Sequence, residues 1–222
     1  IAEETKEPQR GTAVIKILDE KTSSVVNKFI TKKDRIHGMA IDREGKIAFA
    51  AGDMYFAQPG ELCYLSLNEG IVHTIAKGAH FSFPSWSKDS KRIYFTYSPE
   101  KDAPNHVGYV ELATPDSVKQ VAEGISVSIS ESGKIAYLSN NGDIFLMQKP
   151  DDTSASSKQL LKHRDPRFTC SIRFVQRTDD MVLVHYKKGN TFDLILLNSP
   201  YRKEKVMLPY VGMQDFDAAY IK

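Results

Sequence analysis

The feature that most constrains this chain is a short pattern, a polar turn followed by an apolar strand, that returns at a nearly constant interval. The same apolar position in each copy recurs after 93 − 47 = 46, 135 − 93 = 42 and 182 − 135 = 47 residues. These anchor positions are Ile47, Ile93, Ile135 and Val182. A period of about 45 residues indicates supersecondary units that bury their apolar faces by stacking against their neighbours.

Each unit has room for four short strands separated by turn residues. Around the second anchor, extended segments rich in β-branched and aromatic residues are predicted at 81–87, 92–97, 107–112 and 118–122. Turn chemistry separates such segments elsewhere too, as in Asn-Asn-Gly-Asp at 140–143, a strong hairpin signal. No segment shows a convincing helical period. The sequence therefore predicts an all-β fold of four-stranded antiparallel blades, a β-propeller.

The number of blades follows from the innermost strand of each unit. Such strands are predicted at 36–42, 81–87, 126–130, 171–175 and 216–221. Ahead of them, 13–18 and 24–29 look like the last two strands of a further blade. A closed propeller often completes one blade from both chain ends, which removes exposed strand edges. We predict a five-bladed β-propeller closed by pairing of N- and C-terminal strands, although the composite blade lacks one strand; an open part of a longer propeller is the alternative.

Length and charge narrow the class of protein. The chain has 222 residues, which suits a single all-β domain over 11–222. The polar residues 1–10 are expected to be a flexible segment, following either a removed signal peptide or a linker. The net charge is only +2, without the concentrated basic stripe of nucleic-acid-binding proteins. No apolar run reaches the roughly 18 residues that span a bilayer, so neither nucleic-acid binding nor membrane insertion is expected.

The sequence contains none of the short motifs that mark common catalytic or cofactor sites. It has no Gly-x-Ser-x-Gly elbow, phosphate-binding glycine loop, His-Glu-x-x-His or EF-hand pattern. Cys63 and Cys170 lack the spacing of zinc ligands and are interpreted as buried apolar residues, with a disulfide as the less favoured alternative. We therefore expect no cofactor, no metal and no catalytic residue, and the sequence favours a binding role over an enzymatic one.

A binding surface is predicted where the connections between blades emerge beside those between the second and third strands of a blade. These connections combine basic and aromatic side chains, which suits an acidic peptide or protein partner. The predicted binding rim comprises Arg35, His37, Tyr55, Phe56, His80, Arg164, Arg167 and Tyr210. A solvated loop face without a specific partner is the competing interpretation.

Glycoside hydrolysis is an alternative, because five-bladed propellers also carry this activity with two or three carboxylates near the central axis. By position, the candidate carboxylates are Asp42, Asp53, Asp165 and Asp215. Asp42 lies in a repeat turn, and a turn role explains it better. Asp53 lies in a long connection and is less easily dismissed.

One unit carries a family resemblance. Residues 83–95, Phe-Pro-Ser-Trp-Ser-Lys-Asp-Ser-Lys-Arg-Ile-Tyr-Phe, resemble the TolB-type, WD-repeat-like propeller repeat, whose signature is Pro-x-Trp-Ser-x-Asp-Gly-x-x-Ile-x-Phe. Ser90 stands where the signature has Gly, and the other units lack Trp. As a pattern, the resemblance extends over residues 31–209.

The resemblance implies a propeller that binds proteins or peptides, often in the bacterial envelope, or one that shields a peptidase site. We therefore expect a non-catalytic protein- or peptide-binding module of a periplasmic or cell-envelope assembly. Two alternatives are a glycan-binding or glycoside-hydrolysing propeller and the gating propeller of a peptidase whose catalytic domain is absent.

Three residues of the matching unit have predicted structural roles. Trp86 is large and flat enough to fill the space between neighbouring sheets. Pro84 lacks a backbone N–H and suits an inner strand only at a bulge or facing the axis. Asp89 is expected to cap its own turn.

Overall fold

The computed structural model of the chain describes residues 2–4, 13–19, 21–31, 33, 35–52, 59–100, 102–147, 158–161, 169–175, 178–187, 191–197 and 204–211. Every regular element within these residues is a β-strand in an antiparallel sheet. The all-β prediction is thus confirmed. Within the same residues there is no helix of the length and apolar character that crossing a membrane requires.

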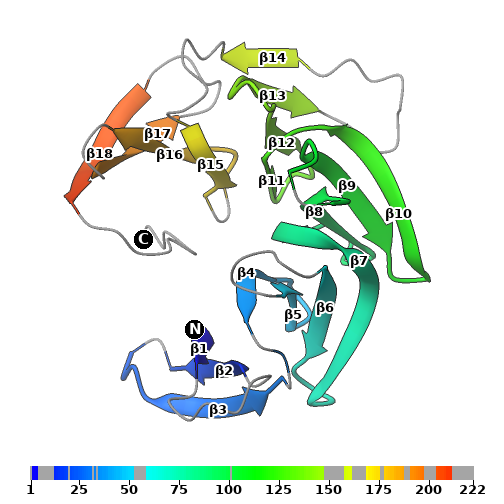
Figure 1. Cartoon of the computed structure of the whole chain (residues 1–222). Coiled ribbons are helices and arrows are strands. Elements are labelled where there is room, and N and C mark those ends of the chain that lie inside the picture. The colour runs from blue at the N-terminus through cyan, green and yellow to red at the C-terminus, as the bar shows by residue number, and fades with distance from the viewer. Residues whose placement is uncertain are drawn as a thin grey trace.

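Two of the sheets occupy the N-terminal half of the chain (Figure 1). The first sheet has the order β1-β2-β3, with bounds Ala2–Glu4, Ala13–Leu18 and Val25–Ile30. The second has seven strands in the order β10-β9-β8-β7-β6-β5-β4. Its bounds are β4 Ile36–Ile41, β5 Lys46–Ala51, β6 Gly60–Ser66, β7 Ile71–Trp86, β8 Arg92–Ser98, β9 His106–Glu111 and β10 Thr114–Glu123.

Two four-stranded sheets follow, each in sequence order. One comprises β11 Ser126–Ile129, β12 Ile135–Leu138, β13 Ile144–Met147 and β14 Lys158–Leu161. The other comprises β15 Thr169–Phe174, β16 Met181–Lys187, β17 Thr191–Leu197 and β18 Glu204–Val211. The predicted anchors Ile47, Ile93, Ile135 and Val182 all lie in the second strand of their unit, in β5, β8, β12 and β16.

The seven-stranded sheet consists of two repeat units that share one long strand. Residues 71–79 of β7 pair with β6, and residues 80–86 of the same strand pair with β8. The sequence predicts two separate strands here, at 71–76 and 81–87. The chain instead runs on without a turn, because nothing between Ala76 and Phe81 forces it to reverse direction; each half still completes a four-stranded antiparallel unit.

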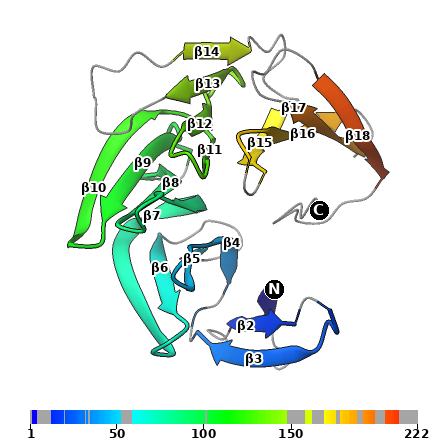
Figure 2. The ribbon, with the colours of Figure 1, turned by 180° about the vertical axis from the view of Figure 1, so that it is seen from behind.

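The units follow one another around a common centre (Figures 1 and 2). The strands nearest this centre are β4, residues 80–86 of β7, β11 and β15, which we call the inner strands. Among the described residues, no strand of β15–β18 pairs with the first sheet. The predicted closing strand 216–221 lies outside the described residues, so closure by strand pairing stays a prediction.

The first sheet has one strand more than the sequence indicates. Ala2–Glu4, inside the segment expected to be flexible, forms β1 and pairs with β2, Ala2 opposite Ile15 and Glu4 opposite Ala13. Its sequence, Ala-Glu-Glu, has no β-propensity that would reveal it. The strand forms because it satisfies backbone groups on the edge of β2, which carries the buried Ala13, Val14 and Ile15.

Pro84 lies at a bulge, as its missing N–H requires. The register of β7 on β8 shifts between Ser82 and Ser85, and Phe83 has a φ of 50°. Gly38 marks the matching bulge of β4, with a φ of 75°, 83 − 38 = 45 residues earlier. Glycine adopts this left-handed conformation without strain, whereas an aromatic residue does not. Of the two equivalent bulges, the one at Phe83 therefore has the strained backbone conformation.

Trp86 fills the space between the two units of the seven-stranded sheet, as predicted. Its side chain is 8% exposed and packs in one apolar cluster with residues of β5, β6, β8 and β9. The indole Nε1–H donates a 3.0 Å hydrogen bond to the carbonyl of Ala40. The rings of Trp86 and Tyr64 meet edge to face, with their centroids 6.1 Å apart. This one side chain thus ties inner strand β4 to inner strand β7.

Serine hydroxyls join the remaining inner strands. The Oγ of Ser85 accepts the N–H of Ile129 at 3.0 Å, which links β7 to β11. The Oγ atoms of Ser126 and Ser128 accept the N–H groups of Ile172 and Phe174, at 3.2 and 3.0 Å, and link β11 to β15. All three serines are buried. Each hydroxyl accepts a hydrogen bond from a backbone N–H on the inner edge of a sheet, where no further strand pairs with it among the described residues.

Ser126 offers the cleanest test of these links, because its side chain is fully buried. Replacing Ser126 with Ala is expected to lower the free energy of unfolding by about 1–2 kcal/mol, since the Ile172 N–H loses its acceptor. Urea unfolding followed by circular dichroism measures the change. Ser117→Ala, at an exposed position of β10, is the control and should be neutral. Equal midpoints for both variants would contradict the proposed role.

Candidate functional site

The residues that precede β4, the facing ends of β5 and β6 and the middle of β7 lie at one end of the second sheet. The carbonyl of Arg35, just before β4, accepts the N–H of Gly52 at the end of β5, at 3.2 Å. A Cβ on Gly52 would lie 3.3 Å from the Cα of Gly60, and Gly60 pairs with Ala79 of β7. These backbone positions form one row, so Arg35, the end of β5, the start of β6 and the middle of β7 share this end.

Three residues of the predicted rim can be placed with their side chains. Arg35 and His37 are half-buried at the start of β4, and His80 is half-buried in β7 beside Ala79. They therefore lie at the same end of the second sheet. The backbone of Tyr210 lies in β18 opposite Phe192, but its side chain is outside the described residues. Outside them altogether lie Tyr55, Phe56, Arg164 and Arg167, together with the candidate carboxylates Asp53, Asp165 and Asp215.

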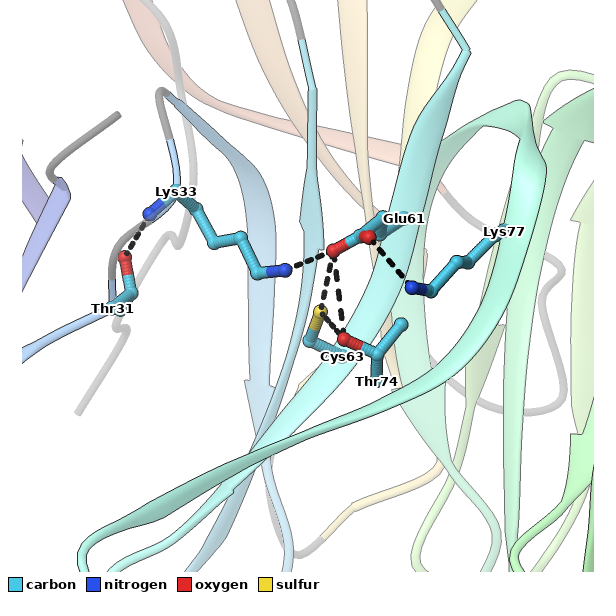
Figure 3. A network of polar contacts seen from close by, with 6 residues as sticks. All are labelled: Thr31, Lys33, Glu61, Cys63, Thr74 and Lys77. Atoms are coloured by element: carbon cyan, nitrogen blue, oxygen red, sulfur yellow. Dashed lines mark hydrogen bonds and ion pairs between the residues drawn. The ribbon is translucent and has the colours of Figure 1, made fainter. Parts of the chain in front are cut away.

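A network of polar side chains that the sequence did not reveal occupies this end of the sheet (Figure 3). At its centre is Glu61 of β6, whose Oε2 pairs with the Nζ of Lys33 and whose Oε1 lies 3.3 Å from the Nζ of Lys77. Thr74 donates to the same carboxylate at 3.5 Å, and its Oγ1 lies 3.6 Å from the Sγ of Cys63. Lys33 belongs to the connection between the first two sheets, so the network joins them.

The electrostatics of this network indicate a structural role rather than a catalytic one. Burial acts to raise the pKa of Glu61, but the ion pairs with Lys33 and Lys77 outweigh it and hold this pKa below its ordinary value. Burial raises the pKa of the Cys63 thiol, although the Thr74 hydroxyl opposes the effect. Glu61 is thus an anion and Cys63 a protonated thiol at neutral pH, which suits neither a general acid nor a nucleophile.

The lowered pKa of Glu61 predicts a pH-dependent contribution to stability. A carboxylate with a depressed folded-state pKa stabilises the fold above its unfolded value, and this stabilisation is lost as pH falls through the folded value. Glu61→Gln is expected to cost about 1 kcal/mol at pH 7, because two partly exposed ion pairs are lost. The difference from the wild type should shrink below about pH 4. Urea midpoints between pH 7 and pH 3 measure it.

Glu123→Gln is the matched control for this prediction, since Glu123 is exposed at the end of β10. It removes the same charge without the network and should leave the midpoint unchanged at every pH. A Glu61→Gln penalty that stays constant down to pH 3 would show that the ion pairs are not its source.

The turns at the opposite end of the units are held by their own side chains. Oδ1 of Asp42 accepts the N–H groups of Glu44 and Lys46, at 2.9 and 2.7 Å. Asp89 accepts the Ser87 hydroxyl at 2.7 Å, which lowers the pKa of its carboxyl group. The predicted capping role of Asp89 is confirmed. Asp42, one of the candidate glycosidase carboxylates, likewise serves its own turn.

Ion pairs connect these turns across the units. Arg43 pairs with Glu131, which lies two units further along the chain, and Lys134 pairs with Asp179 of the following unit. The hydrogen bond from Lys134, helped by that from Ser132, lowers the pKa of the Asp179 carboxyl group. These contacts bridge the turns at this end, whereas Arg35, His37 and His80 lie at the other end.

One contact near the centre joins inner strands that are not neighbours. The guanidinium of Arg173, in β15, lies 5.4 Å from the ring centroid of Phe83, in β7. Its Nη1 is 3.4 Å from the carbonyl oxygen of Pro84. Strand β11 is hydrogen-bonded to both β7 and β15, so the arginine side chain links two inner strands that are each joined to a third. The sequence analysis missed this pair; the only signal was its separation of 173 − 83 = 90 residues, two repeat lengths.

Among the described residues, the inner strands contain one permanently charged side chain, that of Arg173, together with two histidines. Their described sequences are Ile-His-Gly-Met-Ala-Ile in β4, His-Phe-Ser-Phe-Pro-Ser-Trp in β7, Ser-Val-Ser-Ile in β11 and Thr-Cys-Ser-Ile-Arg-Phe in β15. They contain His37, His80 and Arg173, and no aspartate or glutamate. Within the part of the chain that the structure describes, no cluster of His, Cys, Asp and Glu is arranged to hold a metal ion.

Comparison with known proteins identifies the class of fold. No protein-family model matches the sequence, and no curated protein does either. The fold is similar to TolB from Acinetobacter baumannii, with a TM-score of 0.67 and 19% identity, over 89% of this chain and 49% of that one. It is similar to a putative TolB from Agrobacterium tumefaciens, with a TM-score of 0.69 and 15% identity, over 90% and 74%. The chain therefore has a TolB-type β-propeller fold, and spans about half the length of the Acinetobacter protein.

Enzymes share this fold as well. Puromycin hydrolase matches with a TM-score of 0.59 and 12% identity, over 96% of this chain and 38% of that one. A gluconolactonase from Xanthomonas campestris and a prolyl endopeptidase are also among the similar solved structures. At these identities the likeness concerns the fold, so function has to be argued from the residues of this chain.

Proposed function

We propose that this chain is a non-catalytic module that binds a protein or peptide partner with acidic character. The observation that supports it most is the composition of the inner strands, where Arg173 and two histidines occur without any aspartate or glutamate among the described residues. Surfaces of one charge favour partners of the opposite charge and repel others. The TolB-type fold is consistent with this function, and its likeness to TolB suggests the periplasm or cell envelope of a bacterium.

The predicted rim provides the test. Arg164→Glu combined with Arg167→Glu is expected to weaken partner capture at least tenfold, because two attractive charges become repulsive. The immobilised chain is incubated with a bacterial envelope extract, and a protein retained by the wild type is identified and then titrated in pure form. Lys88→Glu with Lys91→Glu makes the same charge change in an exposed turn at the opposite end of the units. Equal binding by both double variants would refute the rim assignment.

The finer architecture in this proposal is a closed five-bladed propeller. In this proposal, segment 216–221 pairs with the edge of β1 that has no strand partner among the described residues, and it becomes the innermost strand. Strands β1, β2 and β3 are then the second to fourth strands of the first blade. This arrangement accounts for the strand that was missing from the composite blade. Deleting residues 212–222 is expected to lower the urea midpoint; a variant as stable as the full chain would count against closure.

A second candidate is the gating propeller of a peptidase. It is favoured by the likeness to puromycin hydrolase, which this chain matches over 96% of its own length. A hydrolase sequence encoded in the same gene would support this candidate, and its absence there would leave the binding module. A third candidate is a propeller that acts on glycans or related sugars, suggested by the gluconolactonase likeness, and turnover on a glycan panel that is lost in Asp53→Asn or Asp165→Asn would support it.

A further inference from the structure

We propose that the outer edge of β3 is a second interaction surface, to which a partner protein adds an extended strand. The added strand places an Asp or Glu side chain opposite Lys28 and an apolar side chain on each side of that acid. This surface goes beyond the binding function proposed above, because it involves none of the residues of the predicted rim.

The position of β3 in its sheet is the first argument. The order of the first sheet is β1-β2-β3, and β3 is its strand farthest from the common centre of the units (Figures 1 and 2). Among the described residues, no strand pairs with the outer edge of β3. The backbone N–H and C=O groups of such an edge are a template on which another extended segment can pair.

The direction of the backbone donors is the second argument. The N–H of Thr31 donates to the carbonyl of Ala13 at 3.0 Å, on the side of β2. Because the N–H direction alternates along a strand, the N–H groups of Ile30 and Lys28 point away from β2. The N–H of Lys28 donates to the side-chain Oδ1 of Asn27 at 2.8 Å. A backbone carbonyl of an added strand would take the place of this local acceptor.

The exposed apolar surface of β3 is the third argument. Val25, Val26 and Ile30 are 51%, 60% and 62% exposed, and they are three of the six large apolar side chains that are exposed among the described residues. The outer strand β10 differs, because its sequence includes Pro115 and three charged residues. Proline and charge protect strand edges from pairing, and β3 has only Lys28. Of these two outer strands, β3 therefore has the less protected edge.

The charge of Lys28 determines the chemistry of the partner. Phe29 packs against the cluster that includes residues of β5 and β6, so Lys28 lies on the opposite face of β3. Alternation places Val26 and Ile30 on that same face. In the described part of the chain, no ion pair involves the ammonium of Lys28. Opposite charges directly across two strands are stabilising, so the complementary face of an added strand has an acid between two apolar residues.

A second copy of this chain is a poorer occupant of the edge. Directly opposite residues of paired strands lie on the same face, so a symmetric antiparallel pair of β3 strands has its axis at a residue. An axis at Lys28 sets the two Lys28 side chains against each other, and like charges there are destabilising. An axis at Asn27 sets Lys28 against Val26. Neither pairing gives the ammonium an acidic partner, so the strand favours a different protein.

The experiment uses the full chain and three capped heptapeptides of sequence Thr-Val-Thr-X-Thr-Val-Thr, in which X is glutamate, glutamine or lysine. This sequence reads the same from either end, so it fits a parallel or an antiparallel added strand. Fluorescein anisotropy measures binding, and amide hydrogen exchange locates it. The wild type is expected to bind the glutamate peptide about threefold more tightly than the glutamine peptide and about tenfold more tightly than the lysine peptide. Slowed exchange should be confined to residues 25–30.

Two variants test the charge and the edge separately. Lys28→Glu should reverse the order, so that the lysine peptide binds most tightly. Lys28→Pro should remove binding of all three peptides, because proline lacks the outward N–H and is tolerated on a strand edge. Lys21→Glu makes the same charge change in the exposed turn before β3 and should keep the order of the wild type. Urea midpoints show whether each variant is folded; if Lys28→Pro is not, the reversal in Lys28→Glu decides the question.

The outcomes separate this surface from the rim. No saturable binding of the glutamate peptide by the wild type up to about 1 mM, the weak end of specific association, would overturn the edge site and leave the rim proposal standing. An unchanged order of peptides in Lys28→Glu would overturn it too. Binding that is lost in the Arg164→Glu, Arg167→Glu variant but kept in Lys28→Pro would assign the peptide to the rim instead. A dimer in sedimentation, with residues 25–30 protected before peptide is added, would assign the edge to a second copy and overturn the proposed partner.

Discussion

Trp86→Ala is expected to lower the free energy of unfolding by about 3–5 kcal/mol, the largest effect of any substitution proposed for this chain. The side chain is 8% exposed and lies in the cluster shared by the two units of the seven-stranded sheet. Removing it leaves a cavity between two units that are tied together by β7, so the surrounding strands cannot easily collapse into it. Chemical unfolding followed by far-ultraviolet circular dichroism measures the loss, because the variant has no tryptophan to report by fluorescence.

Trp86→Phe separates the two contributions of this side chain. Phenylalanine keeps much of the aromatic packing but cannot donate to the Ala40 carbonyl, so a smaller loss of about 1–2 kcal/mol is expected. If Trp86→Ala and Trp86→Phe lower the free energy of unfolding by the same amount, the hydrogen bond contributes more than the packing between the units. The role assigned to Trp86 would then be wrong.

Gly124→Ala is expected to cost about 2–3 kcal/mol through a steric clash with the backbone. A Cβ at this position would lie 2.3 Å from the carbonyl oxygen of Leu138 and 3.2 Å from Cγ2 of Val107. The backbone cannot easily move aside, because the Gly124 N–H donates to Asn105 and the next residue donates to Leu138, both at 2.9 Å. The substitution therefore strains the junction between β10 and β11. Urea unfolding gives the change in free energy.

Gly78→Ala is the matched control for this prediction. Nothing lies within 4 Å of a Cβ at Gly78, but its φ of 86° makes alanine unfavourable there. It therefore isolates the cost of backbone conformation, about 1 kcal/mol. A Gly124→Ala variant that loses no more stability than Gly78→Ala would show that the close approach to Leu138 relaxes without cost.

The strands could be predicted from the sequence because each depends on local pattern. Segment 13–18 was predicted with the bounds of β2, and segment 92–97 differs from β8 by one residue at one end. Pro84 and Asp89 were also predictable, since a missing N–H or a short carboxylate restricts the backbone within a few residues. The strand at Ala2–Glu4 could not be predicted, because its pairing with β2 owes nothing to its own side chains.

The predicted rim stays a prediction, because four of its eight residues lie outside the described part of the chain. Arg35, His37 and His80 were assigned to one edge from the order of strands in a repeat, and they do lie at one end of the second sheet. The pairing of Glu61 with Lys33 and Lys77 had no signal, because charged residues are common on strands and their partners lie in other elements. The stacking of Arg173 on Phe83 joins residues 90 positions apart, beyond any local pattern.

The amino-acid sequence by itself determined the antiparallel β architecture and its repeat of about 45 residues, because alternation, turn residues and spacing act along the chain. Only the tertiary structure decided which side chains meet between repeat units: Trp86 with the Ala40 carbonyl, Ser128 with the Phe174 N–H, and Arg173 with Phe83. The physical reason is that contacts between stacked sheets depend on their distance and twist in space. The distance and twist between two units are set when their apolar faces pack together, so the sequence pattern of one unit does not determine them.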